Sequence, residues 1–328
     1  MSVKTKVLML LEANRDCDLS GQDIAGKLGV TRAAVWKAVK ALKDEGYEIG
    51  AANNRGYRLM GKSDVLSAEG IRPCLRECYQ DNEIVVYKST ASTNLDVKKR
   101  ALDGAKEGLV VLSEEQTAGR GRRGRSFSSP SGTGIYMSFL FRPKPEQSTD
   151  VVLITTAASV AVCRAIRKVL CEEPSIKWVN DVYLGGKKVC GILTEAVSDF
   201  ESGRIDTVVV GIGINYREPK EGFSSDIRDV AGAVCTKENS TPRNTLAAAV
   251  MNELFSLYEG LSEKTYMEDY RRWSNVLGRR VRFSSGDEWA YGTAVEIDDD
   301  GGLRIRTDDG EEQVLRTGEI SLRVCDGK

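Results

Sequence analysis

The first sixty residues repeat apolar positions with the period of a helix and then with the period of a strand. Segments 6–14, 20–28 and 31–46 predict three helices, with Gly29 as the stop of the second, and 47–60 predicts a hairpin. This order is typical of a winged helix-turn-helix, whose last helix enters the DNA major groove. The expected buried stripe of that helix consists of Val35, Ala38, Val39 and Leu42.

The outward face of the third predicted helix is basic and carries no carboxylate. Residues 1–62 hold eleven Lys/Arg and seven Asp/Glu, an excess that suits a nucleic-acid partner. The alternative is a small helical domain with solvated cations, and the pattern leaves it open. The predicted DNA contacts are Thr31, Arg32, Ala33, Trp36, Lys37, Lys40 and Arg55.

The middle of the chain, residues 63–272, alternates strand-like and helix-like segments. Strands outnumber helices and hairpins are common, with one turn at Gly185–Gly186, so we expect an α+β domain with helices on one face of the sheet. Helices are predicted over 151–171 and from Pro242 to Leu261. Residues 273–328 read as short strands between Gly/Asp turns, which predicts a small SH3-like β-barrel.

Composition narrows the class of protein. The 328 residues are 41% hydrophobic and 29% charged, and they show no signal-peptide or membrane-spanning pattern, so a cytoplasmic location is expected. Eight cysteines without a CxxC pair indicate reduced thiols. The chain has no histidine, which excludes Ser-His-Asp and Cys-His hydrolases and histidine metal sites.

The stretch "GRGRRGR", residues 119–125, places four arginines on a glycine-rich backbone. Glycine packs no core and arginine stays charged, so the segment is expected to meet an anion. Nucleic acid is the alternative ligand, but the surrounding sequence is neutral and a concentrated cluster favours a small phosphate-bearing molecule. Two weaker polar clusters follow, "KWVND" at 177–181 and "GIGIN" at 211–215.

These motifs together resemble one family. "STN" (92–94), "EEQTAGRGRRGRSF" (114–127), "KWVND" (177–181), "GKKVCGILTE" (186–195) and "GIGIN" (211–215), in this order behind a helix-turn-helix, resemble the bifunctional biotin–protein ligases that also repress biotin synthesis. The resemblance covers nearly the whole chain. It implies a central mixed sheet like that of class II aminoacyl-tRNA synthetases, within domains 1–62, 63–272 and 273–328.

Two positions depart from the family pattern. Val179 stands where the family usually has proline, and Phe127 stands where it usually has tryptophan. Val179 is not expected to affect the chemistry. Phe127 keeps an aromatic face, so the resemblance still implies a stacking contact with adenine at this position.

The resemblance implies a two-step reaction and a regulatory role. Biotin and ATP with Mg²⁺ would give biotinyl-5′-AMP, and a lysine of a biotin carboxyl carrier protein would then take the biotinyl group. No prosthetic group is implied, and the adenylate-bound homodimer would bind operator DNA. Two alternatives stay open at this point: a non-catalytic repressor that senses a ligand, and a ligase for another acid such as lipoate.

The resemblance also assigns roles to residues of this chain. Arg122 and Lys188 are the implied catalytic residues, and Asp181 is the implied contact of Mg²⁺. The implied biotin-binding residues are Ser92, Thr93, Asn94, Gln116, Gly119, Arg120, Arg122, Lys188 and Gly191. The implied ATP and adenylate contacts are Arg122, Arg123, Arg125, Phe127, Asn180 and Asn215.

Overall fold

The structure is a computed structural model that describes residues 1–52, 56–143, 151–198, 205–236, 241–285, 288–316 and 323–324. Contacts divide the chain into two compact units. One unit combines Met1–Asn82 with Cys235–Asn252, and the other combines Glu83–Val234 with Glu253–Lys328. The division groups the C-terminal segment with the central one, and the ranges 1–62, 63–272 and 273–328 stay a prediction.

The first unit begins with the predicted helix-turn-helix. Ser20 accepts a hydrogen bond from the amide of Asp23 and Thr31 from that of Ala34, so both expected N-caps are confirmed. Gly29 ends the second helix with a φ of 65°, which a glycine adopts without strain. The elements are α1 (Val3–Glu12), α2 (Gly21–Leu28), α3 (Arg32–Asp44), β1 (Ile49–Ala52), β2 (Gly56–Leu59), α4 (Ala68–Ile71) and short 3₁₀ turns at Arg72–Cys74 and Glu77–Tyr79.

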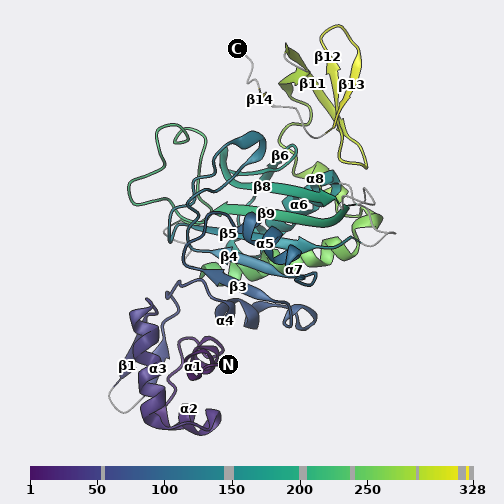
Figure 1. The fold of residues 1–328 in the computed structure, drawn as a ribbon. Helices are drawn as coiled ribbons and strands as arrows, with labels where there is room; N and C mark the ends of the chain where they lie inside the picture. Colours follow the sequence, from purple (N-terminus) through teal and green to yellow (C-terminus); the bar gives the residue numbers. More distant parts are fainter. Residues whose placement is uncertain are drawn as a thin grey trace. The chain divides into compact units, whose positions relative to one another are not determined.

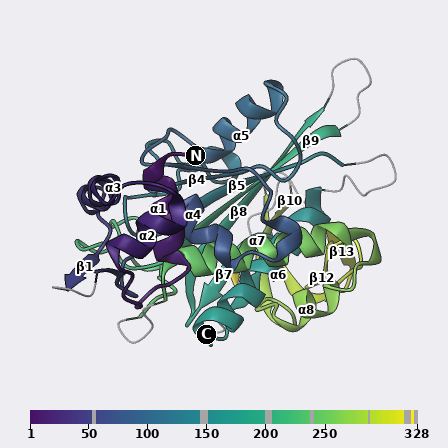
Figure 2. The ribbon, with the colours of Figure 1, turned by 90° about the horizontal axis from the view of Figure 1, so that it is seen from below.

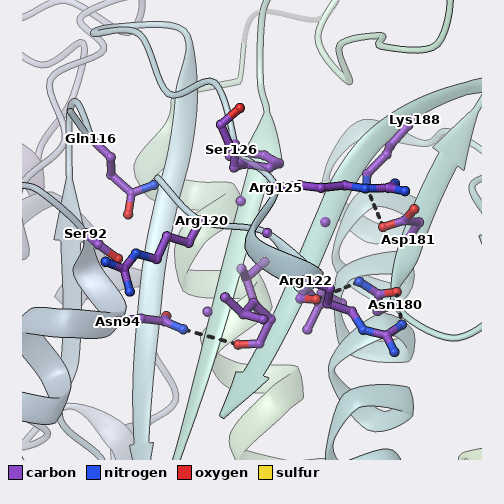
Figure 3. A pocket seen from close by; sticks show the side chains of 18 of the residues that line it. Ser92, Asn94, Gln116, Arg120, Arg122, Arg125, Ser126, Asn180, Asp181 and Lys188 are labelled. Carbon is purple, nitrogen blue, oxygen red and sulfur yellow. Dashed lines mark hydrogen bonds and ion pairs between the residues drawn. The ribbon is translucent and has the colours of Figure 1, made fainter. Parts of the chain in front are cut away.

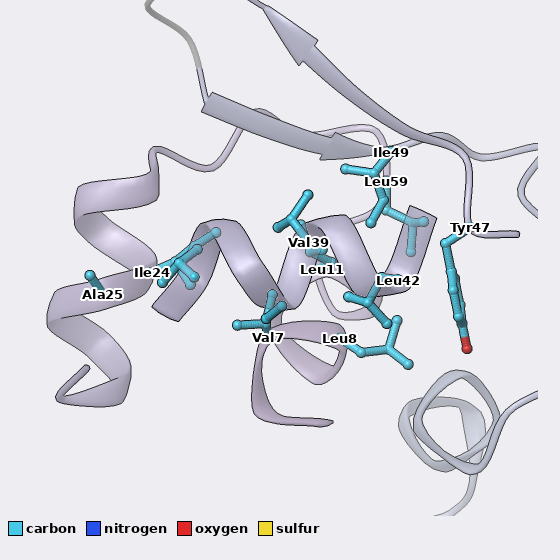
Figure 4. Packing of buried hydrophobic residues seen from close by; sticks show 12 residues of the cluster. Val7, Leu8, Leu11, Ile24, Ala25, Val39, Leu42, Tyr47, Ile49 and Leu59 are labelled. Atoms are coloured by element: carbon cyan, nitrogen blue, oxygen red, sulfur yellow. The ribbon is translucent and has the colours of Figure 1, made fainter. Parts of the chain in front are cut away.

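The three helices share one apolar core with the hairpin (Figure 4). Leu11 of α1, Ile24 of α2, Leu42 of α3 and Leu59 of β2 are each at most 1% exposed. All four members of the predicted α3 stripe are buried, so the inward face of this helix is confirmed. The opposite face of α3 is therefore turned to solvent.

The second unit is built on a mixed seven-stranded sheet in the order β3-β4-β5-β9-β8-β7-β6 (Figure 1). Only β3 and β4 pair in parallel, and every other neighbouring pair is antiparallel. Its strands are β3 (Ile84–Tyr87), β4 (Val110–Ser113), β5 (Gly134–Phe141), β6 (Ser175–Lys177), β7 (Asp181–Leu184), β8 (Lys187–Ser198) and β9 (Ile205–Asn215). Its helices are α5 (Thr93–Leu102), α6 (Val151–Leu170), α8 (Met267–Arg272) and the last part of α7 (Arg243–Glu259), with 3₁₀ turns at Arg122–Gly124 and Leu261–Glu263.

Helices cover both faces of this sheet, so the expected single helical layer is wrong. Val97 of α5 packs with Val209 of β9, whereas Thr155 of α6 donates to Thr194 of β8. Thr194 pairs with Val210, the neighbour of Val209 along β9, and successive side chains of a strand point to opposite faces. Figure 2 shows α5 on one side of strands β5, β8 and β9 and α6 on the other.

Two further expectations were refined by the structure. The hairpin around Gly185 and Gly186 is confirmed, with φ of 55° and 78° as a two-residue turn requires, but β6 adds a third strand before it. Helix α7 ends at Glu259, before the predicted Leu261, which lies in a separate 3₁₀ turn. In the part of the chain that the structure describes, no helix is both long and apolar enough to span a bilayer.

The C-terminal strands form an antiparallel sheet in the order β13-β12-β11-β10-β14. The turn between β11 and β12 reaches the central sheet, where the carbonyl of Gly301 accepts a hydrogen bond from the indole of Trp178 at 2.8 Å. Closure of this sheet as an SH3-like barrel stays a prediction. The strands are β10 (Arg280–Ser285), β11 (Glu288–Ile297), β12 (Leu303–Thr307), β13 (Glu312–Leu315) and β14 (Arg323–Val324).

Candidate active site

A polar cavity of about 220 Å³ lies over the centre of the seven-stranded sheet, on the face that carries α5. Its floor is made of glycines from two neighbouring strands, Gly191 of β8 and Gly211 and Gly213 of β9. A Cβ atom at Gly211 would come within 2.2 Å of the Asn94 amide oxygen, and one at Gly213 within 2.5 Å of the Phe127 ring. Only glycine lets these two side chains lie directly on the sheet.

The arginine loop forms one wall of the cavity. It folds as a small hairpin, because the amide of Gly121 donates to the carbonyl of Arg125 at 2.7 Å and that of Phe127 to the carbonyl of Gly119 at 2.9 Å. Arg123 adopts a left-handed φ of 57° at the tip. The loop thereby turns its four arginines toward the cavity, which all of them line.

The cavity has a cationic end (Figure 3). Arg122 donates to the amide oxygen of Asn180 at 3.1 Å, and Asn180 in turn donates to the carbonyl of Ile192 at 2.8 Å. Burial lowers the pKa of Arg122, and Asp181 opposes that shift. The ammonium of Lys188 lies 2.6 Å from the carboxylate of Asp181. This end therefore holds fixed positive charge with one carboxylate beside it.

The other end of the cavity is a neutral hydrogen-bonding network. The amide oxygen of Gln116 accepts from the backbone N–H of Thr93 at 3.0 Å and lies 3.1 Å from its hydroxyl. The Gln116 amide nitrogen donates to Ser129 at 2.9 Å, and the buried hydroxyl of Ser138 lies 2.7 Å from that of Thr93. Such groups match a neutral polar ligand with both donors and acceptors.

The structure brings most of the predicted site residues together around this cavity. Gly119 and Asn215 do not line it. Gly119 is buried behind Gln116, and a Cβ atom at this position would lie 2.4 Å from the Phe127 carbonyl. The side-chain amide of Asn215 donates to the carbonyl of Gly232 at 3.0 Å. The predicted residues that line the cavity are Ser92, Thr93, Asn94, Gln116, Arg120, Arg122, Arg123, Arg125, Phe127, Asn180, Asp181, Lys188 and Gly191.

Sequence reasoning left other lining residues without a role. Lys177 and Trp178 belong to the "KWVND" motif, and Gly211 and Gly213 to "GIGIN", so the motifs pointed to these positions without assigning them. No local pattern marked Met137, which reaches the cavity from β5. The remaining residues of this kind are Gly121, Ser126, Ile192, Leu193 and Ile212.

Metal ligands are sparse in the described ranges. No group of three or more His, Cys, Asp or Glu side chains gathers there in a way that would hold a metal ion. Asp181 supplies one carboxylate in the cavity, beside Lys188. A single carboxylate is enough for Mg²⁺ only when the ion also binds phosphate oxygens and water.

The exposed face of α3 is the candidate DNA-binding surface. Six of the seven predicted contact residues are exposed: five belong to α3, and Thr31 is its N-cap. The seventh, Arg55, lies outside the described residues. Trp36 is 55% exposed, and the ammonium of Lys40 lies 5.6 Å from its ring centre. The six exposed contacts are Thr31, Arg32, Ala33, Trp36, Lys37 and Lys40.

Comparison with known proteins gives a consistent result. Residues 85–215 match the biotin/lipoate A/B protein ligase family, 3–58 an HTH domain and 276–323 the biotin protein ligase C-terminal domain. The bifunctional ligase/repressor BirA of Bacillus subtilis is 32% identical over 93% of this chain and 94% of its own length. That of Escherichia coli is 30% identical over 99% and 98%. The structure of a biotin protein ligase from Aquifex aeolicus in complex with biotin and ATP superposes with a TM-score of 0.64 at 27% identity, over 74% of this chain and 99% of that one.

Proposed function

The chain belongs to the family of bifunctional biotin ligase/repressors, and from this premise we propose that it joins biotin to a carrier protein and represses transcription. Biotin and MgATP react to biotinyl-5′-AMP and pyrophosphate, and a lysine of a biotin carboxyl carrier protein then attacks the mixed anhydride, forms an amide with the biotinyl group and releases AMP. The observation that carries the proposal is one cavity with Arg122, Arg125 and Lys188 at one end and a neutral network at the other, where Arg120 lies beside Ser92 and Asn94.

The cationic end suits the first step because the reactants repel each other. A carboxylate must approach the α-phosphate of an anionic nucleotide, and fixed positive charge lowers the energy of that approach. We assign Arg122 and Lys188 to the carboxylate and the α-phosphate, and Arg123 and Arg125 to the polyphosphate. Asp181 would hold the Mg²⁺ that accompanies ATP, and the ion would supply screening of the phosphate charge.

The neutral end suits the ureido ring of biotin. Ser92, Thr93 and Gln116 supply the donors and acceptors that such a ring requires, with Arg120 at the edge of the same cavity. We assign the adenine to the aromatic face of Phe127. We propose that Asn215 contacts the adenine through its backbone, because its side-chain amide donates a hydrogen bond to the carbonyl of Gly232.

The arginine loop also protects the intermediate. Its glycines let it close over the adenylate, and a closed loop keeps water from the anhydride until the acceptor lysine arrives. The adenylate-bound form then pairs as a homodimer, so that two α3 helices meet the two half-sites of an operator. Biotin thereby acts both as a substrate and as the precursor of the repressing ligand.

The function is tested with the purified full chain. We expect it to release pyrophosphate from biotin and MgATP, and to add a single biotinyl group to a lysine of an added carrier domain, seen by mass spectrometry. Lipoate in place of biotin serves as the competing acid, and DNA from upstream of biotin-synthesis genes serves in a gel-shift assay with and without adenylate. Failure to form biotinyl-5′-AMP would contradict ligation, and adenylate-independent or absent DNA binding would contradict repression.

A further inference from the structure

A charged pair lies behind the neutral end of the cavity. The carboxylate of Glu195 on β8 accepts from the ammonium of Lys98 on one oxygen at 2.6 Å and from the amide nitrogen of Asn94 on the other at 2.7 Å. Burial raises the pKa of Glu195, but the hydrogen bonds from Lys98 and Asn94, together with the positive charges of Lys98 and Arg120, lower it overall. Glu195 is therefore a carboxylate at neutral pH, and both of its oxygens accept.

This pair fixes the orientation of the Asn94 amide. The amide nitrogen faces two groups that only accept, the Glu195 carboxylate at 2.7 Å and the carbonyl of Leu193 at 3.4 Å. The amide oxygen must then point the other way, where it lies 2.6 Å from the hydroxyl of Ser138. Glycine at position 211 leaves the room for this arrangement, since the oxygen rests on the backbone there.

The orientation leaves the network one proton short. Three oxygen–oxygen contacts run in series: Asn94 to Ser138 at 2.6 Å, Ser138 to Thr93 at 2.7 Å and Thr93 to Gln116 at 3.1 Å. The two amide oxygens carry no proton, so the hydroxyls of Ser138 and Thr93 supply two protons for three contacts. The Gln116 oxygen also accepts from the Thr93 backbone N–H at 3.0 Å, so both oxygens that line the cavity here act as acceptors, and a ligand N–H group is the donor that matches them.

We propose that Glu195 is a specificity-determining positioning residue, which holds the Asn94 amide so that the Thr93–Gln116 end of the cavity selects a substrate with an N–H group. The inference rests on the proposed function, in which the ureido ring of biotin supplies that group. Glu195 does not line the cavity, and it acts through Asn94, Ser138 and Thr93. A site whose acceptors demand a donor rejects a ligand that lacks one.

The pair with Lys98 makes a specific test available. In E195Q one carboxylate oxygen becomes an NH₂ group, and the ammonium of Lys98, which only donates, retains the remaining oxygen. The NH₂ group then faces Asn94 and turns its amide, which gives up only the long 3.4 Å contact with the Leu193 carbonyl, so that Asn94 donates to Ser138. Three protons then serve the three contacts, and the cavity no longer requires a donor from the substrate. Removing Lys98 as well, in K98M/E195Q, frees the introduced amide to turn its oxygen back to Asn94.

The experiment measures kcat/KM for adenylate formation with biotin and with its cyclic carbamate analogues, in which a ring oxygen replaces one ureido N–H. For the parent, at least one of the two analogues should have a much lower kcat/KM than biotin. The ratio of the two kcat/KM values, for biotin and for that analogue, is the preference compared below. E195Q should lower that preference by about tenfold, mainly through a higher KM for biotin, with the KM for ATP within about twofold. K98M/E195Q should recover most of the preference, and K98M alone should keep it.

The outcomes separate the inference from the proposed function. A parent protein that makes no biotinyl-5′-AMP contradicts the function itself. If the parent is active, two results overturn the role of Glu195. One is a preference for biotin in E195Q equal to that of the parent, and the other is a preference in K98M/E195Q as low as that in E195Q. S138A tests the same path independently, because it removes two of the three contacts and should also reduce the preference. Unchanged selectivity in S138A would equally overturn the inference.

Discussion

Substitution of Gly211 by alanine tests how the glycine floor positions the neutral end of the cavity. Its φ lies outside the left-handed region, so the backbone accepts alanine, and the effect is purely one of space. The new Cβ would lie 2.2 Å from the Asn94 oxygen and 2.9 Å from its Cγ, which displaces that side chain. The displacement breaks the bonds of Asn94 to Ser138 and to Glu195.

The size of the effect follows from those two bonds. The bond to the Ser138 hydroxyl contributes about 1 kcal/mol and that to the Glu195 carboxylate about 2 kcal/mol, so the displacement costs about 3 kcal/mol. Where this cost falls on the biotin complex, it corresponds to an increase of about 150-fold in the KM for biotin. The KM for ATP should change by less than about threefold, because Asn94 lies at the end of the cavity remote from Asp181 and Lys188, where the nucleotide phosphates are assigned.

Gly213 provides the matched comparison on the same strand. A Cβ there would lie 2.5 Å from the Phe127 ring, so G213A should raise the KM for ATP more than that for biotin. Initial rates of pyrophosphate release at varied biotin and varied ATP measure both constants. G26A in α2, where a Cβ meets nothing within 4 Å, controls for the glycine-to-alanine change as such. Equal effects of G211A on both substrates, or none on biotin, would refute the division of the cavity into two ends.

Other predictions concern the loop, the DNA face, the C-terminal sheet and Glu195. R122G should release biotinyl-5′-AMP into solution faster than the parent, measured by filtration of a single turnover; equal retention contradicts shielding. K37A should weaken binding to every DNA sequence by a similar factor and reduce the slope of log affinity against log salt concentration by about one, with adenylate formation unchanged. W178F loses the bond to Gly301 and should lower the unfolding free energy by about 1 kcal/mol in urea denaturation. Because the folded pKa of Glu195 is lowered, its stabilisation holds above the ordinary glutamate pKa and is lost on acidification, so E195Q should flatten the acid side of the stability profile.

Local patterns were sufficient for the helix-turn-helix and for the arginine wall of the cavity. Ser20, Thr31 and Gly29 act within a few residues of their own positions, so the sequence shows both the signal and its consequence. The arginines of the loop are contiguous, and a short hairpin turns them toward one cavity. Predictions of this kind need no knowledge of how distant strands pair.

The resemblance named Thr93, Asn94 and Gln116 of the neutral end, but the partners behind them depend on strand register, which the sequence did not reveal. Gly211 of β9 lies directly between Ser138 of β5 and Leu193 of β8 in the sheet, although Ser138 is more than fifty residues from either of them in the sequence. Ser138 is a single serine in an apolar strand, and nothing beside it in the chain indicates its contact with Asn94. The two helical layers were missed for a related reason, since the face that a helix covers depends on the sheet order.

The two ends of the cavity together explain how a chain without histidine can form an acyl-adenylate. The biotin carboxylate is already ionised at neutral pH, so the attack on the α-phosphate needs no general base. The requirement is electrostatic, and arginine meets it because its charge persists even where burial lowers the pKa, as at Arg122. The neutral end must then place the substrate so that its carboxylate reaches those charges, and a small displacement of the ring would move the reacting atoms apart. With the site residues assigned as proposed, catalysis depends as much on the uncharged network around Thr93 and Gln116 as on the arginines.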